Sequence, residues 1–257
     1  MKKYCINFII KENWRLSDMY SMLVLTPENG ALPAGIEPGQ FVQVEIADSK
    51  NTFLRRPISV NFANYDNNEL WLLVRRAGEG TATLIGKAEG ETLNIILPLG
   101  HGFSVAPADG TVLLVGGGVG VAPLLYLGKC LCDKGVDVHF LLGARSAKDL
   151  LELEYFKNYG DVSVTTEDGT MGEKGFVTQH SLWNEAKIAR ISCCGPGPMM
   201  KAVARLAREK GIECEVSLEN VMACGLGACL CCVEDTVQGN VCVCKEGPVF
   251  NINQLKW

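Results

Sequence analysis

Hydrophobic and polar residues alternate in short runs over the first 104 residues, and turn-forming residues separate the runs. Residues 38–46 (PGQFVQVEI), 56–60 (RPISV), 69–74 (ELWLLV) and 91–97 (ETLNIIL) show this pattern. Short strands at such intervals are typical of an antiparallel barrel or sandwich. We therefore predict an antiparallel β-barrel domain over residues 1–104.

The pattern changes at Thr111. A fully apolar run (TVLLV) is followed by the glycines of GGGVG, a helical stretch with Pro123 in its first turn, and another apolar run at 136–142. This order indicates a βαβ unit. Later elements continue it into an α/β domain with a parallel sheet, predicted over residues 105–217. Those elements are strands at 162–166, 191–194 and 213–218 and a helix at 198–209.

Charge and hydropathy narrow the function classes. The 257-residue chain has a formal net charge of -5 and no basic tract, which argues against a nucleic-acid surface. No apolar run approaches the roughly 20 residues needed to cross a bilayer, so we expect no membrane insertion. The apolar part of the N-terminus stops at Lys11, too early for an export signal. These features predict a cytoplasmic protein.

Half of the twelve cysteines lie between residues 224 and 244. In a reducing compartment such crowding indicates a metal site rather than disulfides. Cys224-x4-Cys229-x2-Cys232 has the spacing of three ligands in a plant-type 2Fe-2S ferredoxin, with a fourth ligand further along. We predict a small cluster module over residues 218–257, stapled by its cofactor.

The spacing leaves alternatives. Zinc held by Cys229, Cys232, Cys242 and Cys244 is one, although it gives Cys224 no purpose. If residues 241–244 form a strand, Cys242 and Cys244 share a face, and spacing does not choose the fourth cluster ligand. Cys231 is predicted to be a bystander. Core packing is the expectation for the other thiols of strands and helices, namely Cys5, Cys130, Cys132, Cys193 and Cys214.

Two glycine-bearing strand ends predict a nucleotide site. Glycines after a buried strand let backbone N–H groups approach a phosphate, although GGGVG departs from the usual G-x-G-x-x-G spacing, and a turn without a ligand is the alternative. A second such end, CGPGP, follows a later strand of the same sheet, where α/β proteins bind ligands. The predicted dinucleotide residues are Gly116, Gly117, Gly118, Gly120, Gly195 and Pro196.

Arg56-Pro57-Ile58-Ser59 can place a guanidinium on a pyrophosphate and the end of a strand against a planar ring. Residues 78–81 (GEGT) stand at a predicted strand-to-helix junction that can meet the same phosphates. Each motif is weak alone. Together they predict one phosphate clamp.

These motifs, in this order, resemble the ferredoxin-NADP reductase superfamily. The C-terminal CGLGACLCC with Cys244-Lys-Glu-Gly-Pro248 is similar to the electron transfer subunit family of dihydroorotate dehydrogenase B, over essentially the whole chain. The resemblance implies FAD, a 2Fe-2S cluster and NAD as co-substrate. It also implies Cys224, Cys229, Cys232 and Cys244 as cluster ligands. The FAD contacts it implies are Arg56, Pro57, Ile58, Ser59, Leu73, Val74, Arg75, Gly80 and Thr81. Arg76 is an alternative to Arg75 as the arginine that faces the flavin.

The function implied by the resemblance is a relay in pyrimidine (UMP) biosynthesis. Electrons would pass from the FMN of a dihydroorotate dehydrogenase catalytic subunit through the cluster and FAD to NAD+, in a heterotetramer with two copies of each subunit. Residues 224–244 are expected to face that partner, and Cys194 to lie near the nicotinamide in a positioning role. Arg145-Ser146 leaves NADP as an alternative to NAD.

Two other functions fit the same residues. One is a relay subunit of another complex, such as a hydrogenase, a sulfide dehydrogenase or an electron-bifurcating oxidoreductase. The other is a zinc-stapled nucleotide-binding regulator without redox activity. Both relay functions need a flavin, because NADH gives two electrons as hydride, whereas an iron-sulfur cluster takes one electron at a time.

Overall fold

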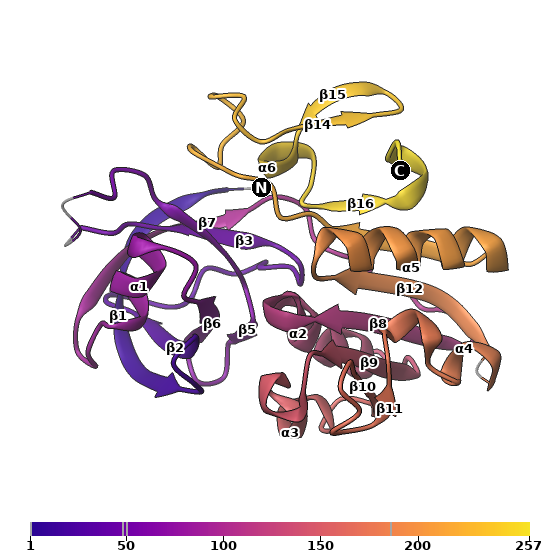
Figure 1. The fold of residues 1–257 in the computed structure, drawn as a ribbon. Coiled ribbons are helices and arrows are strands. Elements are labelled where there is room, and N and C mark those ends of the chain that lie inside the picture. The colour runs from indigo at the N-terminus through magenta and orange to yellow at the C-terminus, as the bar shows by residue number, and fades with distance from the viewer. Residues whose placement is uncertain (1, 48, 50, 186) are drawn as a thin grey trace. The chain divides into compact units, whose positions relative to one another are not determined.

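The computed structural model (Figure 1) describes residues 2–47, 49, 51–185 and 187–257. The chain divides into two compact units. The barrel unit contains Met1–Gly102, Glu219–Glu234 and Asn240–Pro248. The parallel-sheet unit contains Phe103–Leu218, Asp235–Gly239 and Val249–Trp257.

The barrel unit is built on a seven-stranded antiparallel sheet of order β4-β3-β7-β1-β2-β6-β5. The antiparallel architecture predicted from the alternating pattern is confirmed. Its elements are β1 (Tyr4–Arg15), β2 (Tyr20–Pro27), β3 (Phe41–Val44), β4 (Arg56–Ser59), β5 (Phe62–Asn64), β6 (Glu69–Arg75), α1 (Glu79–Ile85), β7 (Thr92–Leu99) and α6 (Val243–Glu246).

Strand β3 is buried on both of its faces, which distinguishes it from the half-buried β1. Successive side chains of a strand point to opposite faces, so Val42 and Val44 lie on one face and Phe41 and Gln43 on the other. All four are at most 3% exposed. The face of Phe41 and Gln43 is covered by the cysteine-bearing segment of the same unit, whose Gly225 lies against Gln43.

A second contact fixes the end of that segment. The N–H of His101, just after β7, donates to the carbonyl of Gly247 at 2.7 Å. A Cβ atom at Gly100 would lie 2.5 Å from Cδ of Pro248 and 3.1 Å from Phe41. The Lys-Glu-Gly-Pro sequence after Cys244 therefore docks on the barrel where β3 and β7 meet.

The parallel-sheet unit has the order β11-β10-β9-β8-β12-β13-β16, parallel except for β16. The predicted βαβ organisation is confirmed. Its elements are β8 (Thr111–Gly117), η1 (Gly118–Val121), α2 (Ala122–Cys132), β9 (Val138–Ala144), η2 (Ala147–Asp149), α3 (Leu153–Phe156), β10 (Asp161–Thr166), β11 (Glu173–Lys174), η3 (Val177–Gln179), α4 (Leu182–Glu185), β12 (Ile188–Cys194), α5 (Gly197–Lys210), β13 (Glu213–Ser217), β16 (Val249–Asn251) and η4 (Ile252–Gln254). A separate hairpin pairs β14 (Val233–Thr236) with β15 (Gly239–Cys242).

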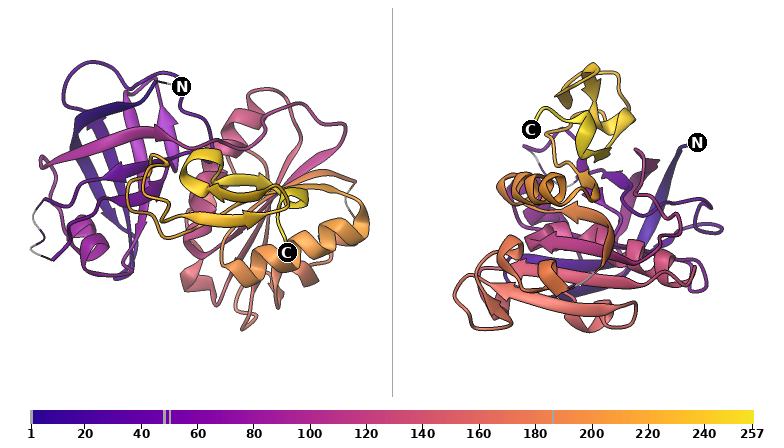
Figure 2. Two further views of the ribbon diagram at one scale, coloured as in Figure 1. Left: turned by 90° about the horizontal axis from the view of Figure 1, so that it is seen from above. Right: turned by 90° about the vertical axis from the view of Figure 1, so that its right-hand side faces the viewer.

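The strand order reverses between β8 and β12. From β8 the chain runs outward through β9 and β10, and then it returns to place β12 and β13 on the other side. Right-handed crossovers in opposite directions place α2 and α5 on opposite faces of the sheet, and Figure 2 shows α5 running along one of them. The carboxyl ends of β8 and β12 thus form a topological switch point, the usual ligand position in such sheets.

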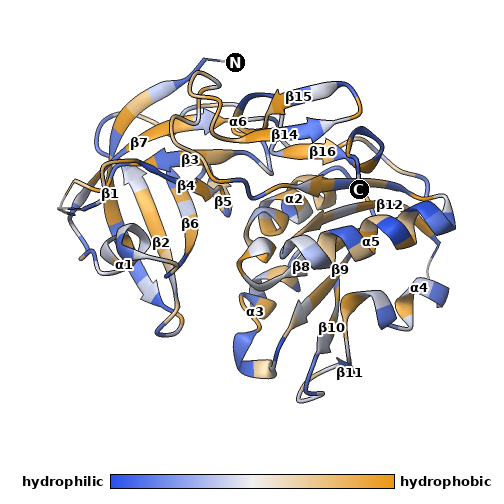
Figure 3. Ribbon diagram, turned by 45° about the horizontal axis from the view of Figure 1, so that its top comes forward, coloured by the Kyte–Doolittle hydropathy of each residue, from blue (hydrophilic) through white to orange (hydrophobic). Residues whose placement is uncertain are grey.

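Helix α5 illustrates how the sequence specifies this unit. Its buried residues are Met200, Val203, Ala204 and Ala207, a spacing that puts them on one helical face. The other positions are mostly polar, and Figure 3 shows the hydrophilic stretches along the helix. Gly211, at φ +66°, ends the helix in the left-handed conformation that glycine adopts without strain.

Some sequence expectations need correction. Residues 241–244 are not one strand, because β15 ends at Cys242 and Cys244 lies in α6. Cys5 and Cys132 are exposed rather than in the core, whereas Cys193 and Cys214 are buried as expected. The division at 104/105 and 217/218 stays a prediction about domains; residues 218–257 are distributed over the two compact units.

Candidate redox cofactor sites

The cysteine segment supplies thiols from a loop and from α6. Cys224 and Cys229 lie in the loop, Cys232 directly precedes β14, and Cys244 is in the single turn of α6. Cys232 and Cys244 are 2% and 1% exposed, whereas Cys224 is half-buried and Cys229 is exposed. None of these thiols is in a disulfide.

The four thiols approach one another as two pairs. Cys224 interacts with Cys229, and Cys244 forms a hydrogen bond with Cys232 and also interacts electrostatically with Cys224. Burial would raise the pKa of Cys224, but backbone N–H groups of the loop and the Cys229 thiol lower that pKa to about 6. Burial and the hydrogen bond with Cys232 raise the pKa of Cys244 to about 12.

Backbone N–H groups also point at these sulfurs. Gly227 N–H donates to Cys244 Sγ at 3.1 Å, Leu226 N–H to Cys224 Sγ at 3.3 Å, and Cys244 N–H to Cys232 Sγ at 3.4 Å. Such donors stabilise thiolate ligands and tune an iron-sulfur cluster. The donor set therefore fits a cluster with four thiolates.

Glycines make the loop possible. Gly225 and Gly227 have φ angles of +69° and +84°, which residues other than glycine rarely adopt. A Cβ atom at Gly225 would lie 2.7 Å from the Gln43 side chain, so the loop also needs the small residue for its contact with β3.

No group of three or more His, Cys, Asp or Glu side chains within the described ranges is arranged to hold one metal ion. A four-cysteine zinc site gathers all its ligands on one ion, whereas a 2Fe-2S cluster distributes four thiolates over two irons. Four cysteine thiols match the ligand number of either site.

Two further thiols lie close by. Cys231 is exposed, so the expectation that it is a small buried hydrophobe is wrong. That it points away from the ligands stays a prediction. Cys242 is half-buried; its Sγ lies 4.0 Å from the Gly227 carbonyl and it interacts with Cys232. Cys242 remains the rival of Cys244 for the fourth position.

In the barrel, the structure brings together the two halves of the predicted phosphate clamp. Gly80, in the first turn of α1, packs on the guanidinium of Arg56 so closely that a Cβ atom would be 2.7 Å from Nε and 3.2 Å from Cζ. The Thr81 hydroxyl accepts from the N–H groups of Ala77 and Gly78 at 2.8 and 3.1 Å, which fixes the start of the helix. Thr52 also touches this position.

The neighbouring Arg55 has a different environment. Its Nη1 donates to the carbonyls of Gln43 and Asn94, and its Nη2 donates to Asn94 Oδ1 at 2.6 Å. Arg55 therefore ties β3 to β7. Arg56 is the arginine that the sequence predicted for the pyrophosphate, and its Nη1 donates to the carbonyls of Leu54 and Arg55, just before β4.

The other predicted flavin residues lie on β4 and β6. β4 is an edge strand of the sheet, so the outer edge of Arg56, Pro57, Ile58 and Ser59 has no strand partner among the described residues. Leu73 and Val74 are 2% and 0% exposed. Arg75, in contrast, is exposed. The flavin contacts of these three residues stay predictions.

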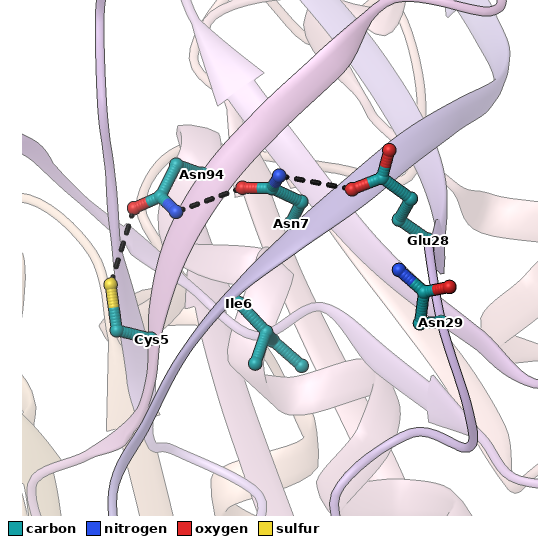
Figure 4. A pocket seen from close by; sticks show the side chains of 6 residues that line it. All are labelled: Cys5, Ile6, Asn7, Glu28, Asn29 and Asn94. Atoms are coloured by element: carbon teal, nitrogen blue, oxygen red, sulfur yellow. Dashed lines mark hydrogen bonds between the residues drawn. The ribbon is translucent and has the colours of Figure 1, made fainter.

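A polar pocket occupies another part of the barrel (Figure 4). It is lined by Cys5, Ile6, Asn7, Glu28, Asn29 and Asn94. Its side chains bond to one another in a chain, from Cys5 to Asn94, from Asn94 to Asn7 and from Asn7 to Glu28. The chain ends at Arg55 through Asn94, so this network supports the strand pairing rather than presenting free groups.

In the parallel-sheet unit, the two predicted glycine-bearing strand ends meet at the switch point. A Cβ atom at Gly120 would lie 2.5 Å from the backbone of Gly195. Gly117 and Gly195 both pack on Met199 of α5, with contacts of 2.6 Å to an added Cβ atom. Gly116, Gly118 and Pro196 belong to the same strand ends. Close packing of the two loops thus explains part of the glycine pattern.

Cys194 is the last residue of β12 and is 1% exposed. Its backbone packs against the first glycine loop, since its carbonyl carbon is 2.7 Å from a Cβ atom added at Gly120. Its predicted role near a nicotinamide stays a prediction.

Comparison with known proteins decides the family. Residues 219–256 match the iron-sulfur cluster binding domain of dihydroorotate dehydrogenase B, and residues 114–205 match the oxidoreductase NAD-binding domain. The chain is 40% identical, over 99% of its length and 99% of the relative's, to the dihydroorotate dehydrogenase B (NAD(+)) electron transfer subunit of Bacillus velezensis. The subunit of Bacillus pumilus is 41% identical over 84% of this chain and 85% of its own.

The chain belongs to the family of dihydroorotate dehydrogenase B electron transfer subunits. The resemblance read from the sequence is therefore confirmed. A solved structure of NADH-dependent reduced ferredoxin-NADP oxidoreductase, a system of flavin-based electron bifurcation, is also similar. It is 28% identical, with a TM-score of 0.87, over 100% of this chain and 92% of that one. The ferredoxin reductase of carbazole 1,9a-dioxygenase, at 19% identity and a TM-score of 0.69 over 82% of this chain and 67% of that one, shares the fold.

As a member of this electron transfer subunit family, the chain carries an iron-sulfur binding segment and an NAD-binding domain. Among the described residues, no helix is both long and apolar enough to span a bilayer. Sequence reasoning missed three residues at these sites: Gln43 beneath the cysteine loop, Thr52 beside Gly80, and Met199 under the glycine loops. No local pattern marks them, because each contact joins distant parts of the sequence.

Proposed function

We propose that this chain is an electron relay subunit that joins the FMN of a dihydroorotate dehydrogenase catalytic subunit to NAD+, in pyrimidine synthesis. The observation that carries the proposal is the similarity over the full length to subunits with that name, together with a paired four-thiol site and a nucleotide fold in one chain. The predicted cytoplasmic location and the heterotetramer, with two copies of each subunit, belong to this proposal.

Each predicted site has a task. Arg56 and Gly80 would hold the pyrophosphate of FAD, and the edge of β4 would lie along its ring. Cys224, Cys229, Cys232 and Cys244 would hold the cluster. FAD accepts two electrons from or gives two to a nicotinamide and exchanges single electrons with a cluster.

The parallel-sheet unit would bind NAD at the switch point. Gly118, at φ +57° with nothing within 4 Å of an added Cβ atom, leaves open space beside the backbone at the end of β8. A pyrophosphate can approach the peptide groups there without meeting a side chain. In contrast, Gly117 and Gly120 are already packed against the second loop.

Exposed apolar side chains support a docking surface at the cysteine loop. Val221 and Leu230 are 80% and 65% exposed, and Leu226 and Val233 are 42% and 37% exposed. They flank the thiols in sequence within the barrel unit. Clustered exposed apolar residues mark protein interfaces, so we propose that this loop faces the catalytic subunit, which shortens the electron path to its FMN.

A second candidate function is a relay subunit of an electron-bifurcating complex. The similarity to the bifurcating oxidoreductase structure over the whole chain favours it. Both functions use the same three cofactor sites and differ in the partner that docks on the cysteine loop.

The experiment that tests the proposal begins with anaerobic purification of the chain, alone and coexpressed with an FMN-containing dihydroorotate dehydrogenase subunit. We expect FAD and two irons per chain and a heterotetramer by light scattering. Leu230→Asp should weaken association at least tenfold without loss of iron, whereas Phe176→Asp, 60% exposed in the parallel-sheet unit, should not. A chain without iron or flavin contradicts the redox proposal; a loaded chain that does not associate contradicts the partner and favours the second candidate.

A further inference from the structure

The side chain of Gln43 is buried and has no hydrogen-bond partner. It is 0% exposed on β3, and both Nε2 and Oε1 lack a partner in the described structure. A buried carboxamide without a partner has lost its hydrogen bonds to water without replacing them, which destabilises the fold. Such a group in a native fold requires an explanation, and an absent ligand is one.

The carboxamide lies against the cysteine loop. A Cβ atom added to Gly225 would be 2.7 Å from Gln43 Nε2 and 3.1 Å from Cδ. Gly225 follows Cys224 directly and belongs to the four-residue stretch between Cys224 and Cys229. The unpartnered amide is therefore at the segment that the family uses to bind its cluster.

The backbone of Gln43 is firmly held. Its carbonyl accepts from Arg55 Nη1 at 3.3 Å, and Arg55 also bonds to Asn94 of β7. Gln43 pairs across the strands with Pro57 of β4, one of the predicted flavin contacts. A rigid strand thus carries the amide between the predicted flavin strand and the thiol loop.

We propose that Nε2 of Gln43 donates a hydrogen bond to a sulfur of the cluster or of its ligands Cys224 and Cys229, and thereby raises the reduction potential of the cluster. The inference rests on the proposed function, because it needs a cluster in the loop. The sulfurs of a cluster and of its thiolate ligands accept hydrogen bonds. The cluster with these ligands is negatively charged, and its negative charge increases by one on reduction. A fixed donor stabilises the more negative, reduced state more strongly.

Gln40 provides a matched control. It is also 0% exposed, but its Nε2 donates to the Gly100 carbonyl at 2.9 Å and its Oε1 accepts from Glu37 N–H at 2.8 Å. Its amide is fully used inside the barrel. Gln40→Leu should therefore lower thermal stability and leave the cluster potential unchanged.

The test is an EPR-monitored redox titration of the chain loaded with FAD and iron. Gln43→Leu should make the midpoint potential of the cluster more negative by about 59 mV. For a one-electron couple, this shift corresponds to about a tenfold decrease in the equilibrium constant for reduction. Gln43→Glu, which replaces the donor by a carboxylate, should shift it at least as far. A potential in Gln43→Leu equal to that of the unmodified chain overturns the inference and leaves the proposed function standing.

A second measurement uses the unmodified chain, in case both variants lose the cluster. Selective labelling with ¹⁵N-glutamine should give a ¹⁵N hyperfine coupling to the reduced cluster, absent when glutamine is unlabelled. The Gln40→Leu variant should keep this coupling, which excludes Gln40, the other fully buried glutamine of this part of the barrel, as its source. A labelled, iron-loaded chain without the coupling overturns the inference, whereas a chain without iron overturns the proposed function and this inference together.

Discussion

Arg56 and Gly80 lie in direct contact: an added Cβ atom at Gly80 would overlap the guanidinium, at 2.7 Å from Nε. The two residues come from β4 and α1, and they were singled out by separate sequence motifs. Their contact forms a compact cationic position beside an edge strand. That position is the structural basis of the proposed FAD site.

Arg56→Ala should weaken FAD binding. The loss of one charge-assisted bond to a pyrophosphate costs about 1.5–3 kcal/mol, which corresponds to about 10- to 100-fold in Kd. The measurement is fluorescence titration of the flavin-free chain with FAD. Arg205→Ala is the control, since that exposed side chain lies on α5 in the parallel-sheet unit and should leave the Kd unchanged. Equal affinities for the two variants would show that Arg56 does not bind the pyrophosphate.

Cys244→Ser should lose the cluster, and Cys242→Ser should keep it. Cys244 is 1% exposed, pairs with Cys232 and receives the Gly227 N–H, whereas Cys242 is half-buried. Iron and sulfide per chain after anaerobic purification give the result. Cys231→Ser, at an exposed position between two ligands, controls for a general effect of thiol removal. Iron loss in Cys242→Ser with retention in Cys244→Ser would exchange the assignments.

Gly120→Ala should destabilise the parallel-sheet unit. Its new methyl group would lie 2.5 Å from the backbone of Gly195, and backbone cannot turn aside as a side chain can. Overpacking of this kind costs about 1–3 kcal/mol. Gly197→Ala is the matched control, with nothing within 4 Å of its Cβ position, and should be neutral or slightly stabilising in α5. Chemical denaturation measures both; equal stabilities would contradict the close contact of the two loops.

Glu215→Gln should remove part of the pH dependence of stability. Burial raises the pKa of Glu215 in the fold, although the Ser104 N–H and Arg190 oppose this effect. A carboxyl whose pKa is higher in the folded state than in the unfolded state keeps its proton up to a higher pH in the folded state. The free energy of unfolding therefore decreases as pH rises from the unfolded pKa to the folded one. The difference between variant and parent should grow over that interval, from about pH 4.5 upward; a constant difference would contradict the shift.

Much of this arrangement follows from local patterns. The alternating runs predicted the antiparallel strands, and the apolar run before GGGVG predicted β8 and the loop after it. The junction at residues 78–81 was predicted correctly because glycine and threonine have strong local preferences at a helix start. Cysteine spacing predicted the chemistry of the loop because three ligands lie within nine residues.

Other features depend on contacts between distant segments. The strand considered for residues 241–244 failed because Val243 turns into α6, which brings Cys244 back toward Cys232. The role of Gln43 could not be predicted, since β3 looks like any alternating strand until the cysteine loop covers its second face. Likewise, Met199 under Gly117 and Gly195 appears only when β8 and β12 are neighbours.

Electrons should cross this chain from a partner's FMN to NAD+. The corresponding measurement is NADH formation from dihydroorotate and NAD+ by the complex of the catalytic subunit with this chain, followed by the absorbance of NADH under anaerobic conditions. We expect NADH formation by the complete complex and a loss of at least 100-fold when the chain is omitted or carries Cys244→Ser. An undiminished rate with Cys244→Ser, or no NADH from a fully loaded complex, would contradict it.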